Sequence, residues 1–356
     1  FPEHPATAWV LRPQVRTPMN PDGAGEGGLQ ERVLEALGYL GGKAADTVLY
    51  PLASDQRIYW VYLLSAMLIA TGVFALQHPG KGAPRKLLGL LWPREVLGHP
   101  SAVVDYKFFL INRFTFAALI APLLLSLDAV SFHTARLLGP LLGEPSLRQP
   151  AVVDQLAYTT AMLLAGDFAT FFGHYLQHRV PFLWEFHKAH HSAQVLTPIT
   201  VYRMHPVDDI VGGCVVALAM GLTDGVFRSL YATTPTTLLL LNLNVFVFLF
   251  FLAGYNLRHS HVWLSYPGWL SRVLISPAQH QIHHSKAERH HDRNLGFIFA
   301  VWDRIFRTLY VPREREALEY GLADDEHLEM NSVWQLYARP FRTLAARLSP
   351  AKGRPA

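Results

Sequence analysis

The chain has 356 residues, of which 51% are hydrophobic and only 16% are charged, whereas soluble domains usually carry about 25% charged residues. Its 31 basic residues only slightly outnumber its 27 acidic residues, and they form no basic stripe with interleaved aromatic residues. This distribution excludes a nucleic-acid-binding protein. Cys214 is the only cysteine, which excludes an intramolecular disulfide and a thiolate metal site.

The N-terminal region, residues 1–57, is expected to be a tail. Residues 1–28 are rich in Pro and Gly. Residues 29–40 (LQERVLEALGYL) have a helical periodicity that suits a helix lying along a membrane surface.

Apolar segments dominate the rest of the chain up to residue 254. They cover residues 58–76, 114–127, 151–173, 210–222 and 237–254. The first has no charge and the length of a membrane-spanning helix, and the last is the most apolar. Residues 210–222 are short, so we expect them to be re-entrant or half-buried. The first and last segments lack a polar stripe, which indicates helices within a membrane rather than helices in the core of a soluble protein.

Basic residues beside the apolar segments predict the orientation. They occur after the first segment (Lys81, Arg85, Lys86, Arg94, Lys107) and around the histidine-rich regions (Arg179, Lys188, Arg203, Arg258, Arg272, Lys286, Arg289, Arg293). Lys and Arg accumulate on the cytoplasmic side of membrane proteins. We therefore expect an all-α, multi-pass transmembrane helical bundle with a cytosolic histidine-box cap. Residues 58–150 would form a transmembrane hairpin and loops, 151–310 a catalytic domain, and 311–356 a cytosolic C-terminal tail.

Histidines gather in three boxes within the expected catalytic domain. HYLQH holds His174 and His178, HKAHH holds His187, His190 and His191, and HQIHH holds His280, His283 and His284. Spacings of three and four residues place side chains on one face of a helix. Imidazole is the commonest metal ligand among side chains. Eight histidines exceed the three or four that one ion needs, so the boxes predict two metal ions.

Other polar residues recur near the boxes. Asp167 lies seven residues before His174, on the same helical face. Asn256, His259 and His261 follow the last apolar segment, and Asp292, Asn294 and Asp303 follow the third box. Ligating histidines usually donate their second N–H to a carboxylate or carbonyl, so we expect Asp167, Asp292 and Asp303 to accept such bonds.

In this order, the motifs HYLQH, HKAHHS, RMHP, NLRHSH, SPAQHQIHHS, HHDRNLG and WDRIF resemble the fatty acid hydroxylase/sterol desaturase superfamily over residues 150–310. The resemblance implies an integral-membrane di-iron oxygenase with two Fe ions, replaced by zinc in some purified preparations, and O₂ as co-substrate. It implies nine metal ligands: His174, His178, His187, His190, His191, His259, His280, His283 and His284. Asp167, Asn256, His261, Asp292 and Asn294 are further candidate site residues because of their places near the boxes. For His261 the alternatives are an extra ligand or a polar pocket residue. Two positions depart from the family: His261 stands where many members have asparagine, and Arg307 where glycine is common.

The predicted function is therefore O₂-dependent hydroxylation of a lipid C–H bond. Because the chain has no nucleotide or haem module, electrons would come from a separate donor protein. A desaturase with the same metal site remains an alternative. So do a membrane metal transporter or binding protein and a zinc-dependent lipid hydrolase. The lipid substrate, the position of attack and the oligomeric state stay open.

Overall fold

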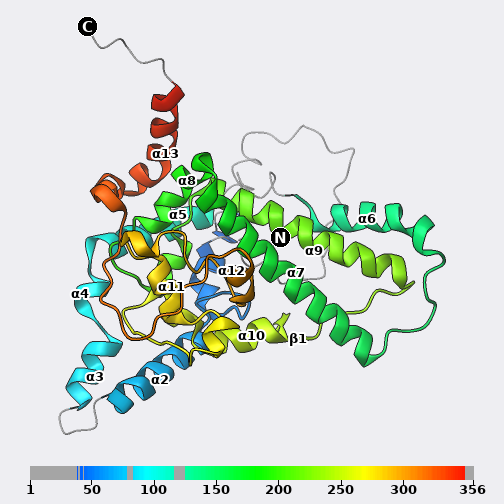
Figure 1. Ribbon diagram of the computed structural model, residues 1–356, viewed down its shortest axis with the longest axis horizontal. Helices are drawn as coiled ribbons and strands as arrows, with labels where there is room; N and C mark the ends of the chain where they lie inside the picture. The colour runs from blue at the N-terminus through cyan, green and yellow to red at the C-terminus, as the bar shows by residue number, and fades with distance from the viewer. Residues whose placement is uncertain (1–37, 39–40, 43, 78–82, 116–124, 349–356) are drawn as a thin grey trace.

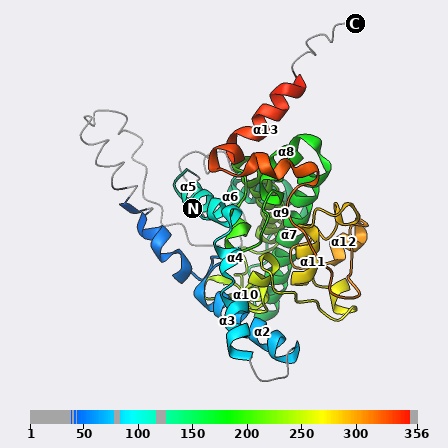
Figure 2. The same ribbon diagram turned by 90° about the vertical axis from the view of Figure 1, so that its left-hand side faces the viewer.

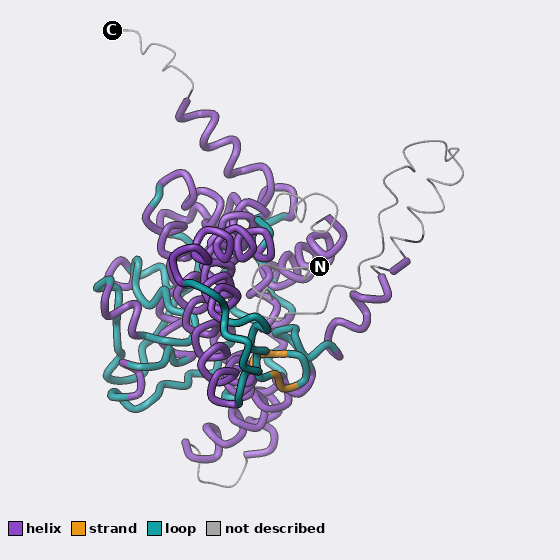
Figure 3. Tube along the Cα trace, turned by 90° about the vertical axis from the view of Figure 1, so that its right-hand side faces the viewer, coloured by secondary structure: helices purple, strands orange, loops and turns teal. Residues whose placement is uncertain are grey.

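The computed structural model describes residues 38, 41–42, 44–77, 83–115 and 125–348 of the chain. These residues are mostly helical (Figures 1 and 3). The strands in this described part are β1 (Leu239–Leu240) and β2 (Leu243–Asn244), which form one short antiparallel ribbon. The fold class is all-α, as the sequence predicts. Most of the expected N-terminal tail and its surface helix lies outside the described residues.

The described α-helices vary in length, and long connections with short 3₁₀ helices separate α10, α11, α12 and α13. The α-helices are α2 (Trp60–Gln77), α3 (Ala83–Leu91), α4 (Arg94–Leu97), α5 (Pro100–Thr115), α6 (Leu127–Leu142), α7 (Val152–Arg179), α8 (Pro181–His191), α9 (Pro206–Leu230), α10 (Val245–Leu252), α11 (Pro277–His283), α12 (Val301–Ile305) and α13 (Val333–Leu348). The 3₁₀ helices are η2 (Tyr50–Leu52), η5 (Pro198–Tyr202), η6 (Tyr255–His259), η7 (Leu270–Arg272), η8 (Glu288–His290) and η9 (Ala323–Met330).

Helices α6, α7 and α9 pack together and extend to one side of the molecule (Figure 1). Gly221 and Gly225 allow the close approach of α9 to α6, since a Cβ atom there would lie 2.7 Å from Val130 Cβ and 2.5 Å from Thr134 Cβ. Small residues four apart let helix backbones approach closely in this way. The buried Asp224 carboxylate joins the three helices, because it accepts hydrogen bonds of 2.6 Å from Ser131 on α6 and Tyr158 on α7.

The predicted apolar segments become helices of unequal length. Residues 58–76 correspond to α2, residues 151–173 begin α7, and residues 210–222 lie inside the 25-residue helix α9 rather than in a short half-buried one. Residues 116–124, within the segment 114–127, lie outside the described residues. Among the helices that the structure describes, α9 alone is long and apolar enough to cross a membrane, and α2 is a shorter apolar helix.

Residues 237–254, the most apolar segment, do not form one helix. The chain makes the β1–β2 ribbon first and then the eight-residue helix α10. Such a helix is about 12 Å long, whereas a hydrocarbon core is about 30 Å thick. Helix α10 packs instead on α2, where the buried Tyr62 ring lies 5.4 Å from Phe248 and 5.3 Å from Phe251. The apolar run therefore supplies part of an aromatic protein core.

The C-terminal region returns to the body of the protein. Tyr337 in α13 donates a hydrogen bond to Asn112 in α5, and Arg347 forms a 2.6 Å ion pair with Glu185 in α8. The C-terminal part of α13 extends away from the other helices (Figure 2). Residues 311–348 thus support the helix that carries the second histidine box.

Candidate metal centre

Four helices present the histidines of the three boxes and of NLRHSH. His174 and His178 lie one turn apart near the end of α7, and the second box ends α8. His259 ends η6, and the third box occupies α11 and the residue after it. Pro181 and Pro277 begin α8 and α11 at positions where the missing N–H is harmless. Ser276 and Gln279 form a capping box that starts α11.

All nine histidines that the resemblance implies as ligands meet in two groups. The five-histidine cluster contains His174, His178, His187, His191 and His283, and the four-histidine cluster contains His190, His259, His280 and His284. Within each cluster, one ring nitrogen from every residue lies within 4.8 Å of the others. Each cluster thus has enough nitrogen donors for one metal ion.

The two clusters lie side by side because neighbouring residues are divided between them. His190 and His191 are consecutive in the chain but belong to different clusters, as do His283 and His284. The rings of His191 and His284 stack at 4.8 Å between centroids, which joins the clusters directly. Two bound ions would therefore be close neighbours.

The ring nitrogens have the state that metal binding requires. In the five-histidine cluster, the Nε2 atom of every member is buried and has no hydrogen-bond partner among the residues that the structure describes. In the four-histidine cluster, His259 Nε2 lies 3.1 Å from the Nε2 atoms of His280 and His284. That separation matches ligands about 2.0–2.1 Å from a shared ion, which lie roughly 3 Å apart. Burial lowers the pKa values of His187, His283 and His284 well below 6.5, so their lone pairs are free at neutral pH. The residues fit two ions that accept nitrogen ligands.

Residues 292–295 orient three rings of the five-histidine cluster through their Nδ1 atoms. Leu295 O lies 2.9 Å from His174 Nδ1, and Arg293 O lies 2.9 Å from His283 Nδ1. Asp292 Oδ1 lies 3.2 Å from His178 Nδ1. Such contacts fix the ring orientation and leave Nε2 for the metal. We call residues 292–299 the anchor loop.

Buried carboxylates hold the backbone of the anchor loop. Asp167 accepts hydrogen bonds from the N–H groups of Ile298 and Phe299 and from the Trp302 indole. Asp303 accepts from the N–H groups of Leu295 and Gly296, at 2.8 Å each. Burial raises the pKa of Asp303 to about 6 despite these bonds. The expectation that Asp167 and Asp303 accept from ligand histidines is therefore wrong, because the loop's backbone donors occupy their oxygens.

Two other predicted site residues also have structural partners. Asn294 adopts the left-handed conformation (φ 55°), and its side chain joins Gln279 O to Tyr310 N. Asn256 donates to Arg57 O at 3.0 Å. Neither belongs to a histidine cluster in the described part of the chain.

His261 also lies apart from both clusters. Its Nε2 atom is 2.8 Å from Leu90 O, so the ring faces α3. Among the described residues it belongs to neither cluster, so the interpretation of His261 as an extra ligand is wrong. The alternative, a polar pocket residue, stays a prediction.

Asp208 is a site residue that the sequence does not reveal. Its Oδ2 atom lies 3.7 Å from His187 Nδ1, and neither atom has a hydrogen-bond partner in the described residues. Both side chains are about 1% exposed. An acidic residue in the first turn of a helix is ordinary, because it interacts favourably with the helix dipole. Nothing in the sequence therefore distinguishes Asp208 as a site residue. A shift of about half an ångström would let the carboxylate accept from His187.

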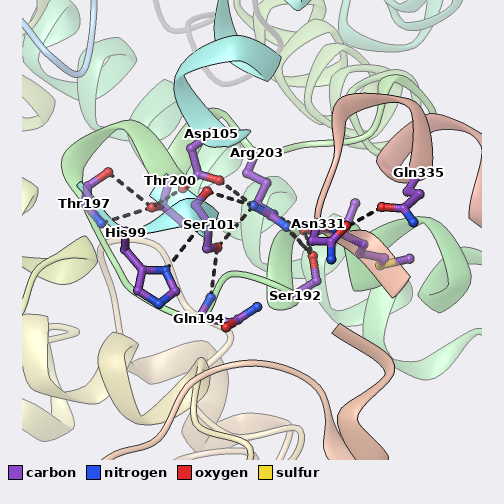
Figure 4. Close-up of polar contacts among 12 residues, drawn as sticks. His99, Ser101, Asp105, Ser192, Gln194, Thr197, Thr200, Arg203, Asn331 and Gln335 are labelled. Atoms are coloured by element: carbon purple, nitrogen blue, oxygen red, sulfur yellow. Dashed lines mark hydrogen bonds and ion pairs between the residues drawn. The ribbon is translucent and has the colours of Figure 1, made fainter. Parts of the chain in front are cut away.

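A buried ion pair holds the second box in place (Figure 4). Arg203 NH1 lies 2.6 Å from Asp105 Oδ1 in α5, and Arg203 Nε donates to Ala189 O between the box histidines. The same guanidinium donates to Ser192 Oγ and Met330 O. The adjacent His205 caps α9, since its Nδ1 accepts from Val207 N. The RMHP motif is thus a structural junction among α5, α8, α9 and the C-terminal region.

Comparison with known proteins gives a family match and curated relatives. Residues 159–308 match the family described as fatty acid hydroxylase. The chain is 24% identical over 179 residues to the alkylglycerol monooxygenase of Caenorhabditis elegans, and the matched region covers 48% of this chain and 32% of that protein. It is 26% identical over 162 residues to the ornithine lipid hydroxylase OlsE of Rhizobium tropici, and the matched region covers 45% of this chain and 44% of that protein. These matches span less than half the length of either relative. No solved structure matches the chain.

Proposed function

Residues 159–308 of this chain belong to the fatty acid hydroxylase superfamily, and from this premise we propose that the protein is an O₂-dependent, non-haem di-iron lipid monooxygenase. The reaction joins a lipid C–H bond, O₂, two electrons and two protons to give a lipid alcohol and water. Two iron ions, when bound, would supply O₂ activation and the oxidising power that attack on an unactivated C–H bond needs.

The observation that carries this proposal is the pair of adjacent all-histidine clusters. Neutral imidazoles suit iron, and two neighbouring clusters suit a pair of ions. The chain's own residues would orient the rings through the anchor loop and exclude water from the site. His187 and His284 are each only 1% exposed, so the centre is shielded from solvent.

The proposed substrate is a lipid, because both relatives are named for lipid chemistry. We further propose a multi-pass membrane protein with the histidine clusters on the cytoplasmic face, where a separate donor protein delivers electrons. The apolar helix α9 and the exposed apolar residues of α2, including Leu64 and Leu68, support contact with lipid. Arg203 and Arg258 are buried and do not bear on the orientation, which rests instead on exposed residues such as Arg179 and Arg289.

Metal content and oxygen transfer test the proposal together. His283→Ala removes a ligand of the five-histidine cluster and His190→Ala one of the four-histidine cluster. We expect each variant to hold about one ion fewer per chain than the wild type, and to lose activity. His133→Ala, an exposed histidine outside both clusters, is the control. Metals would be counted by mass spectrometry, with iron restored to preparations that carry zinc.

The fate of labelled O₂ separates the alternatives. A monooxygenase places one ¹⁸O atom from ¹⁸O₂ in the lipid product, whereas a desaturase leaves an unlabelled alkene. A hydrolase consumes no O₂, and a transporter moves metal without changing lipid. Full turnover by a preparation that binds one ion, or none, would contradict the di-iron proposal.

A further inference from the structure

A cavity of about 260 Å³ lies outside the site described above, and its lining includes His261, two residues after His259 in the chain. It is lined by Val73, Phe74, Lys86, Gly89, Leu90, His261, Val262, Trp263 and Arg315. These residues come from the end of α2, from α3, from the segment after η6 and from the C-terminal region. We call it the His261 pocket. None of the nine clustered histidines lines it.

The charges of the His261 pocket have one sign. Lys86 and Arg315 are its charged lining residues, and no carboxylate lines it. Within the described residues, neither cation forms an ion pair. Arginine and lysine brought together without an acid attract an anion, and the guanidinium geometry matches phosphate oxygens.

His261 adds a hydrogen-bonding group of the opposite kind. Since its Nε2 lies 2.8 Å from the carbonyl oxygen of Leu90, Nε2 must carry the ring proton and donate it. The Nδ1 atom is then an acceptor, suited to a hydroxyl or ammonium group of a ligand. A molecule that carries a phosphate and such a donor would satisfy both sides of the pocket.

The remaining walls are apolar and continue onto an exposed apolar surface. Val73, Leu90, Val262 and Trp263 line the pocket. Beside it, α2 exposes Leu68 and Leu76, and α3 exposes Leu88, with Leu76 86% exposed. A free phosphate ion would make no use of these surfaces, whereas a lipid would place its headgroup at the cations and its chains on the apolar residues.

We propose that the His261 pocket binds the phosphate-bearing headgroup of the lipid substrate. The inference rests on the proposed function, because it names the class of lipid that the enzyme would oxidise. One wall of the pocket is formed by His261, Val262 and Trp263, which directly follow the segment that holds His259, a member of the four-histidine cluster. Headgroup binding here would hold a lipid next to the metal centre and select for a phosphate group.

Binding of a short-chain lipid to the metal-loaded protein tests the proposal without requiring turnover. The probe is dihexanoyl phosphatidylglycerol, compared with dihexanoylglycerol, which lacks the phosphate, and with inorganic phosphate. Trp263 reports binding by its fluorescence, and Trp263→Phe identifies its signal among the eight tryptophans. We expect Lys86→Gln and Arg315→Gln each to weaken binding of the phospholipid by about 5–10-fold, as for loss of a charged hydrogen bond.

Matched controls carry the same change outside the pocket. Arg313→Gln removes an exposed arginine two residues from Arg315, and Lys107→Gln an exposed lysine on α5. Both should bind the probe like the wild type. Equal loss in the controls, unchanged binding in the pocket variants, or equal affinity for dihexanoylglycerol would overturn the proposal. Inorganic phosphate that binds as tightly as the phospholipid would show an anion site rather than a lipid site.

The same probe separates this inference from the proposed function. His283→Ala should still bind dihexanoyl phosphatidylglycerol, because His283 is outside the pocket, even though its activity is lost. In the active enzyme, Lys86→Gln should raise KM for a phospholipid substrate about 5–10-fold and leave kcat near the wild-type value. Probe binding with unchanged KM would refute the substrate role of the pocket.

Discussion

Gly296→Ala tests whether the anchor loop organises the metal centre. A Cβ atom added at Gly296 would lie 2.6 Å from Asp303 Oδ2, 2.8 Å from Ile275 Cγ1 and 2.9 Å from Phe299 O. Two of these neighbours are a buried carboxylate and a backbone carbonyl, so neither can rotate away. An ordinary contact begins near 3.4 Å, so the loop and Asp303 must separate by about 0.8 Å.

Overpacking of this kind costs about 1–3 kcal/mol of folding free energy. The shift also moves Leu295 O and Arg293 O, which orient His174 and His283. Loss of such orienting contacts typically lowers metal affinity about 10–100-fold. We therefore expect Gly296→Ala to lower Tm and to weaken the five-histidine cluster more than the four-histidine cluster.

Thermal unfolding and competition with a chelating dye would measure the two effects on purified protein. Gly268→Ala is the control, because the nearest atom to its added Cβ is the flexible Arg272 NH1 at 3.5 Å. If Gly296→Ala has the Tm of the wild type and holds both ions with unchanged affinity, the anchor loop does not have the role argued here.

Four further substitutions test the surroundings of the site. Asp208→Asn should lower metal affinity about 10–100-fold in the dye competition. Asp292→Asn should lower it by less, because the Asp292 carboxylate is 34% exposed and also pairs with Arg179. Equal effects of the two substitutions, or no effect of either, would contradict the assignment of Asp208. Arg307→Gly should raise the free energy of unfolding by about 0.5–1 kcal/mol, because Arg307 adopts φ 62°, where glycine avoids the strain of a side chain. A lower Tm would refute this account of why glycine is common at this position. Arg203→Lys should lower the free energy of unfolding by about 3 kcal/mol, because one ammonium group cannot replace the contacts to Asp105, Ala189 O and Met330 O. A Tm equal to that of the wild type would show that this junction contributes little to stability.

The sequence determined those features that depend on local spacing. Histidines three and four residues apart share a helix face whatever the rest of the fold does, so the boxes predicted their own clustering. The number of imidazoles indicated two ions, and the motif order indicated the family whose model matches residues 159–308. The length and apolar character of α2 and α7 followed from the same local signals.

Tertiary structure decided how those groups meet. Consecutive residues such as His190 and His191 point into different clusters because the other ligands approach α8 from two sides. Asp167 shares a helix face with His174, yet its carboxylate oxygens accept hydrogen bonds from backbone N–H groups of the anchor loop instead of from a histidine. Asp208 gave no signal in the sequence but lies against His187, because α9 packs on α8. Helical periodicity fixes only the direction in which a side chain leaves its own helix, whereas the partner it meets there depends on packing between segments far apart in the chain.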